Sequence, residues 1–127
     1  MTKTLTQESL RNFTGSESFF RHWANRAFLY TEGVHHVAEH GGAFWLIDKI
    51  ALTNRYEPKI MRERFQHWKL TVASDHTATL VCDDGNDSQV FSETLEFTDF
   101  PLPEIRFYVI ENEFGAGHFT MMLLSEY

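Results

Sequence analysis

The stretch Phe65-Gln66-His67-Trp68-Lys69-Leu70-Thr71-Val72 decides which fold the chain can adopt. Apolar side chains occupy every second position from Trp68, and polar side chains occupy the positions between them. Successive side chains of a strand point to opposite faces. This period of two therefore predicts a strand with one buried face and one wet face.

Four later stretches continue the strand pattern. We expect strands over residues 77–82, 89–97, 104–110 and 118–124. In the stretch 89–97, one face carries the side chains that we expect to be buried: Phe91, Leu95 and Phe97. Short connections between successive strands favour antiparallel neighbours. The second half of the chain therefore predicts an antiparallel sheet of four to five strands.

The first part of the chain shows helix-start signals. Thr4 with Gln7, and Thr14 with Glu17, have the spacing of a capping box, in which hydroxyl and acid or amide side chains bond the backbone of the first turn. Each pair is expected to open a short helix, and the second helix is expected to run to Trp23. Residues 27–30 are expected to be extended.

Two longer helices are predicted further along. The first begins at Thr31 and ends at the glycine pair 41–42. The second covers residues 43–53. Its core-facing stripe is expected to be Phe44, Ile47, Ile50 and Ala51. Residues 54–64 are interpreted as a solvated connector, in which Pro58 can open a helical turn.

Length and composition place these elements in one domain. The chain has 127 residues, of which 43% are hydrophobic, enough for one core and too few for several domains. We predict a single α+β domain over residues 1–127, in which the mainly helical residues 1–64 pack on one face of the sheet formed by residues 65–127.

Several classes of protein are disfavoured by what the sequence lacks. No run approaches the roughly 20 apolar residues of a membrane helix, and the N-terminus has no signal-peptide stretch. The single cysteine, Cys82, cannot form an internal disulfide. No phosphate-cradling glycine loop, serine elbow or dinucleotide fingerprint is present. We expect a cytoplasmic protein without membrane contact and without a cofactor.

Charge is distributed unevenly along the chain. Residues 1–64 carry nine Lys/Arg and seven Asp/Glu, whereas residues 65–127 carry two Lys/Arg and eleven Asp/Glu. Binding a phosphate backbone requires clustered cations, so direct binding of nucleic acid is disfavoured. The acidic half is suited to a partner protein with a basic surface, or it serves solubility alone.

The histidines of the segment 35–40 are candidate metal ligands. His36 and His40 lie one helical turn apart, the spacing that lets two imidazoles share a metal ion. The metalloprotease pattern requires glutamate directly after the first histidine, where Val37 stands, and a third ligand would have to come from His22, His67 or a sheet carboxylate. A polar helix face with surface histidines is the plainer interpretation.

The acidic segment after the second predicted strand offers two further candidates. Two adjacent carboxylates raise the pKa of a thiol, and free cysteine is among the residue types most often buried, so Cys82 is predicted to be a packed core residue rather than a nucleophile. Asp83, Asp84 and Asp87 lack the ligand spacing of an EF-hand and are interpreted as an acidic hairpin turn. We retain these three carboxylates as candidate contacts for a basic partner.

Aromatic residues are crowded between positions 19 and 45. Trp45 lies about 100° round its helix from Phe44, outside the core-facing stripe, so its indole is available to face a partner or a pocket. Packing in the core is the competing interpretation. If aromatics do remain exposed, a homodimer is the first assembly to expect.

Six blocks of the sequence resemble one family. They are Phe13-Thr14-Gly15-Ser16-Glu17, Leu29-Tyr30-Thr31-Glu32-Gly33-Val34, Ala43-Phe44-Trp45-Leu46-Ile47-Asp48, Cys82-Asp83-Asp84-Gly85-Asn86, Phe97-Thr98-Asp99-Phe100-Pro101-Leu102 and Leu124-Ser125-Glu126-Tyr127. The chain is similar to small bacterial proteins grouped only as a domain of unknown function, often carried on plasmids and other mobile elements. The resemblance implies membership and no activity.

Two functional hypotheses follow from these patterns. The preferred one is a non-enzymatic binding or accessory protein that uses the acidic half, or the exposed aromatics near Trp45, to hold another protein. The alternative is a small metal-dependent hydrolase centred on His36 and His40. The charge asymmetry and the lack of an assembled catalytic set favour the first.

Overall fold

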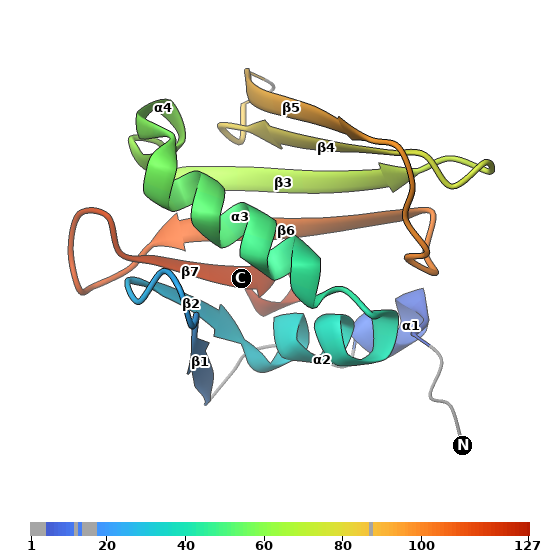
Figure 1. Cartoon of the computed structure of the whole chain (residues 1–127). Helices are drawn as coiled ribbons and strands as arrows, with labels where there is room; N and C mark the ends of the chain where they lie inside the picture. The colour runs from blue at the N-terminus through green and yellow to red at the C-terminus, as the bar shows by residue number, and fades with distance from the viewer. Residues whose placement is uncertain (1–4, 12, 14–17, 87) are drawn as a thin grey trace.

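A computed structural model describes residues 5–11, 13, 18–86 and 88–127. In this part of the chain the strands form one sheet, in the order β1-β2-β7-β6-β3-β4-β5 (Figure 1). The strands are β1 (Phe19–Arg21), β2 (Phe28–Thr31), β3 (Phe65–Val72), β4 (Ala78–Asp83), β5 (Gln89–Leu95), β6 (Glu104–Glu111) and β7 (Phe119–Leu123). The prediction of an α+β fold is confirmed.

The sheet is larger than predicted, and it is mixed. It has seven strands rather than four to five, and β2 pairs in parallel with β7, while the other neighbouring pairs are antiparallel. The expectation of a purely antiparallel sheet made by the second half was therefore wrong. The two additional strands, β1 and β2, come from the half that we expected to be mainly helical.

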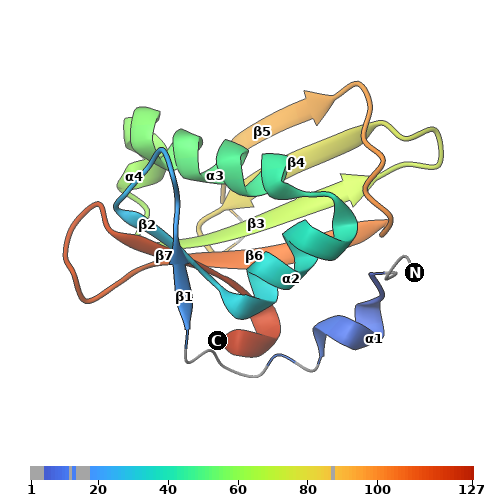
Figure 2. The ribbon, with the colours of Figure 1, turned by 60° about the horizontal axis from the view of Figure 1, so that its bottom comes forward.

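The segment 19–21, which was expected to be helical, forms a strand, whereas the helix predicted over residues 43–53 extends to Tyr56. The helices are α1 (Gln7–Leu10), α2 (Glu32–Gly41), α3 (Phe44–Tyr56) and α4 (Pro58–Met61), and a 3-10 turn, η1 (Leu124–Glu126), follows β7. Figure 2 shows α2 and α3 on the same side of the sheet, with β1 and β5 at its opposite edges. The buried face of the sheet packs against these two helices.

The period of two in the second half is confirmed in β3 and β4. Trp68 and Leu70 of β3, and Leu80 and Cys82 of β4, are fully buried. Gln66 is buried as well, although it is polar, because its side chain bonds Asn54 of α3 and accepts from the Trp68 indole at 2.8 Å. The strand β3 is thereby fixed to the end of α3.

Two aromatic residues do not follow the predicted burial. Phe44, assigned to the core stripe of its helix, is 47% exposed. Its ring forms a T-shaped pair with the His35 ring, with 5.8 Å between the two ring centroids. Phe97 is 71% exposed because β5 ends at Leu95, so the alternation of that strand stops before it. The other stripe positions Ile47, Ile50 and Ala51 are buried as predicted.

The start of the chain differs from the predicted pair of short helices. Residues 19–21, expected in the second helix, form β1, which is held by backbone pairing to β2. The residues 14–17, which were to cap that helix, lie outside the described residues, as does Thr4. The first helix exists as α1, but its capping residue is Thr6, whose Oγ1 accepts from Ser9 N at 3.0 Å.

The longer helices begin and end where the sequence placed them, within a few residues. Thr31 caps α2 and accepts from Val34 N, and Gly42 ends the helix with a φ of 62°, a conformation that glycine adopts without strain. The segment 54–64 is not simply a solvated connector: Pro58 opens α4, and Ile60 is fully buried. No helix in the described ranges is long and apolar enough to span a membrane.

Candidate protein-binding groove

A groove separates α3 from the edge strand β5. Its wider part is an open hollow of ≈ 500 Å³. The side chains that line this part from α3 are spaced about one turn apart: Trp45, Lys49, Leu52, Thr53 and Tyr56. Phe91 and Glu93 line it from β5. A second hollow, of ≈ 290 Å³, continues past the end of β5 and is lined by Trp45, Leu95, Phe97, Thr98 and Asp99. We call the two hollows together the α3–β5 groove.

Trp45 is the residue shared by the two hollows. Its position follows from helix geometry, since Leu46, Ile47 and Ile50 turn toward the core and residue 45 lies beside that stripe, where its indole is partly buried against the core. Two aromatic side chains at the groove are largely exposed, Tyr56 by 68% and Phe97 by 71%. Exposed aromatic surface around a hollow is a common feature of protein interaction sites.

One ion pair crosses the groove. Lys49 Nζ of α3 lies 2.5 Å from Glu93 Oε2 of β5, and both side chains are partly exposed. Phe91, Glu93 and Leu95 point to the helix side of the sheet, because their partners in β4 are the buried Cys82, Leu80 and Ala78. The same alternation that builds the core therefore places a carboxylate in the wall of the groove.

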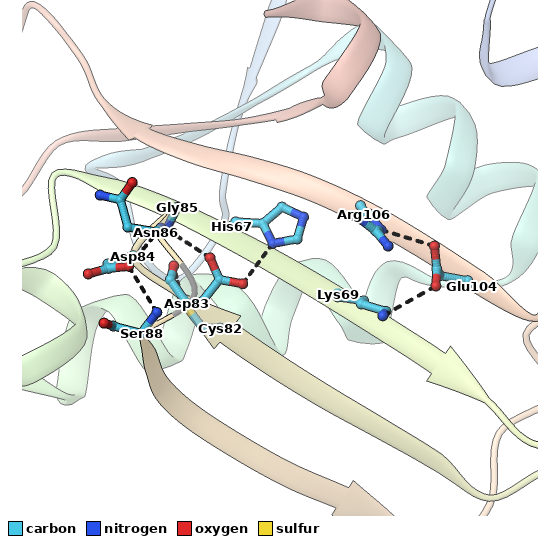
Figure 3. A network of polar contacts seen from close by, with 10 residues as sticks. All are labelled: His67, Lys69, Cys82, Asp83, Asp84, Gly85, Asn86, Ser88, Glu104 and Arg106. Carbon is cyan, nitrogen blue, oxygen red and sulfur yellow. Dashed lines mark hydrogen bonds and ion pairs between the residues drawn. The ribbon is translucent and has the colours of Figure 1, made fainter.

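The acidic hairpin that we kept as a candidate binding site lies at the start of β5, and its carboxylates bond their own loop. Asp83 Oδ1 accepts from Gly85 N at 2.8 Å, and Asp84 Oδ1 accepts from Asn86 N at 2.8 Å and from Ser88 N at 3.3 Å (Figure 3). These bonds stabilise the turn, which is the usual role of aspartate there. Asp87 lies outside the described residues.

A histidine–aspartate pair, which the sequence reasoning missed, lies on the opposite face of the sheet. His67 Nδ1 is 2.9 Å from Asp83 Oδ2 (Figure 3). The ring centroids of His67 and Tyr108 lie 5.9 Å apart. The pairing of His67 with Asp83 across the β3–β4 hairpin was the available signal, because equal distances from the turn place the two residues opposite each other.

This pair alone does not make a catalytic set. An orienting carboxylate and a histidine need a nucleophile in hydrogen-bond reach. Cys82 precedes Asp83, but alternation places its thiol on the buried face, where it is 0% exposed. Burial, followed by the charges of Asp83, Glu63 and Asp84, raises the pKa of the Cys82 thiol far above its usual value. The thiol is therefore suited to packing and not to nucleophilic attack.

A second polar cluster lies on the same open face. Arg106 Nε donates to Glu104 Oε2 at 3.0 Å, and Lys69 Nζ lies 3.4 Å from Glu104 Oε1 (Figure 3). The hydrogen bond from Arg106 lowers the pKa of the Glu104 carboxyl. Because the three side chains neutralise one another in part and are well exposed, we interpret the cluster as a cross-strand ion network.

The proposed metal pair is present without a third ligand in the described chain. The rings of His36 and His40 lie 4.3 Å apart, as expected for one helical turn. The two histidines considered as third ligands bond elsewhere, His22 to Asp48 at 2.7 Å and His67 to Asp83. Among the residues that the structure describes, no three His, Cys, Asp or Glu side chains gather as metal ligands do.

Comparison with known proteins gives a family and no activity. No curated protein and no solved structure matches the chain. One family model matches residues 4–127, nearly the whole sequence, and its description is "Family of unknown function (DUF6876)". The resemblance seen in the six sequence blocks is thereby confirmed, and the chain belongs to this family of unknown function.

Proposed function

We propose that the protein is a non-enzymatic binding module that holds a partner protein in the α3–β5 groove. The observation that carries the proposal is that two hollows meet at Trp45, between a helix and a free sheet edge. Both hollows are open at the surface rather than enclosed, which suits the side chains of a partner protein, and aromatic anchors dominate the energy of such contacts.

Charge supports a basic partner. From Leu70 to Ile105, a range that includes β5, the chain contains no lysine or arginine and eight Asp/Glu. Asp84 at one end of β5 and Asp99 at the other add negative charge along the same edge. Complementary charge raises the association rate and selects the partner. A protein with a basic surface therefore fits this edge better than an acidic or neutral one.

A library of random linear peptides displayed on phage tests this function. We expect selection on the wild-type chain to enrich peptides whose binding is lost in Trp45→Ser. Trp23→Ser is the matched control, because Trp23 is 75% exposed and bonds Asp48, outside the groove. Peptides that bind Trp45→Ser as well as the wild type, or a selection that enriches no peptide, would contradict the proposed function.

A further inference from the structure

The free edge of β5 adjoins the groove along its length. Among the strands that the structure describes, β5 pairs with β4 only, so one row of its backbone N–H and C=O groups faces away from the sheet. A register shift at Cys82 and Asp83 puts an extra residue in β5 at Val90, and the pairing is regular from Phe91 to Leu95. A regular edge of five residues is long enough to pair with another strand.

β5 carries some of the usual protections of a sheet edge and lacks others. Exposed edges are typically blocked by proline, by lysine, by a bulge, by an inward-pointing charge or by a very short strand. β5 has the bulge at Val90 and the inward-pointing Glu93, but its regular part, Phe91 to Leu95, contains no proline and no lysine. β1, the other edge, has three residues, and its Arg21 Nη1 donates to Arg26 O at 2.7 Å. The two edges therefore differ in what they can accept.

The groove would receive alternate side chains of an added strand. Side chains on one face of neighbouring strands lie side by side, so those next to Phe91, Glu93 and Leu95 would point toward Trp45 of α3. Main-chain bonds would give such a partner its affinity, and the two hollows would select its side chains. This arrangement needs an extended segment and excludes a helix.

Charge favours a different protein over a second copy of this chain as the partner of the β5 edge. If all five regular residues, Phe91 to Leu95, paired antiparallel with the same residues of another copy, the register would centre on Glu93 and place the two Glu93 side chains opposite each other. Like charges opposite each other are destabilising. A lysine or arginine in the added strand would instead meet Glu93, whose present partner is Lys49.

We infer that β5 accepts an extended, lysine- or arginine-bearing segment of another protein as an eighth strand, with alternate side chains in the α3–β5 groove. The inference rests on the proposed function of this groove and adds the conformation and the charge of the partner.

Three synthetic ten-residue peptides test the inference by fluorescence anisotropy. The first alternates valine and lysine, the second alternates valine and glutamate, and the third is the first with every backbone amide methylated, so that neither edge of the peptide can donate. We expect the valine–lysine peptide to bind, and the other two to bind at least about tenfold more weakly, because one loses the charge match and the other loses the main-chain bonds. Glu93→Gln should weaken binding of the first peptide severalfold.

The outcomes separate the inference from the proposed function. Equal binding of the methylated peptide, or of the glutamate peptide, would overturn strand addition by a basic segment. If none of the three binds, while library peptides bind in a Trp45-dependent way, the inference is wrong and the function stands. A dimer in sedimentation equilibrium that Ser92→Lys dissociates would assign the edge to a second copy and overturn the inference. Methylation changes the peptide alone, so the test does not depend on the folding of a variant.

Discussion

The two sides of α3 differ in how they are attached to the sheet. We call the β1–β2 side the closed side and the β5 side the open side. On the β1–β2 side, the turn between the strands is bonded to the helix: His22 Nε2 to Asp48 Oδ1 at 2.7 Å, Trp23 Nε1 to the same oxygen at 3.0 Å, and Asn25 Nδ2 to Ala51 O at 2.9 Å. On the β5 side, a groove crossed by the Lys49–Glu93 ion pair separates helix and strand.

Among the described residues, more hydrogen bonds hold α3 on its closed side than on its open side. His22 is 2% exposed, and its Nδ1 accepts from the backbone N–H groups of Ala24 and Asn25, so its Nε2 carries the proton that is donated to Asp48. Buried polar groups that are fully bonded fix one geometry. The β1–β2 side is therefore built for rigidity, and the β5 side leaves backbone and aromatic groups available.

The largest expected effect is on the closed side. His22→Phe keeps a ring of similar shape but leaves two backbone N–H groups without an acceptor and removes one of the two donors to Asp48 Oδ1, so we expect the free energy of unfolding to fall by about 3 kcal/mol. Urea unfolding followed by circular dichroism measures the change. Lys49→Met, on the open side, is the control and should cost less than about 1 kcal/mol. Equal losses of unfolding free energy in the two variants would contradict the difference between the closed and the open side.

A second prediction concerns the attachment of β5 to the sheet. Cys82 lies opposite Phe91 in the β4–β5 pair, so its thiol stays covered as long as β5 is docked. With its pKa raised by burial, Cys82 should react with a disulfide reagent at pH 8 at least about 100-fold more slowly in the native chain than in the unfolded chain. Fast reaction of the native chain would mean that β5 detaches, and a strand that detaches offers no ordered edge.

The third prediction separates binding from stability at the groove. Trp45→Ser should lower the free energy of unfolding by about 1 kcal/mol, because the indole is only partly buried and leaves no sealed cavity. Trp68→Phe, which removes one of the two donors to the buried Gln66 Oε1 and leaves a gap in the core, should cost more. A loss for Trp45→Ser as large as that for Trp68→Phe would make Trp45 a core residue.

The smallest expected effect is a titration on the closed side. Burial, and then the negative charge of Asp48, raise the pKa of the Tyr30 phenol. Asp48→Asn removes the second cause only, so the pKa should move down slightly and stay above its usual value. Because the phenol ionises first in the unfolded chain, the stability that it contributes should fall as the pH rises above about 10. Ultraviolet absorbance of tyrosinate follows the titration, and an unchanged pKa in Asp48→Asn would contradict this assignment.

The sequence predicted the parts of the fold that depend on local pattern. Alternation identified β3 within the limits Phe65–Val72, and cap residues identified α2, since Thr31 and Gly42 act within one turn of the backbone. β1 was missed because three residues are too few to show a period, and they are strand only through their pairing with β2.

The parts that were missed depend on contacts between distant residues. β2 pairs in parallel with β7, some ninety positions later, and no local signal marks that pairing. The interpretation of Trp45 came from its place on the helix wheel. Glu93 and Tyr56, which line the same groove, were not singled out, because only the packing of α3 across the sheet brings them beside Trp45.

A ¹⁵N NMR titration of the chain with the valine–lysine peptide tests most directly whether β5 accepts an added strand. We expect amide shifts to change along β5, from Phe91 to Leu95, together with the Trp45 indole signal, and outward amides of β5 to become protected from exchange. The amides of β1, at the other edge of the sheet, should stay unchanged. Shifts that follow β1, or that leave β5 unaffected while the peptide binds, would contradict the assignment of β5 as the accepting edge.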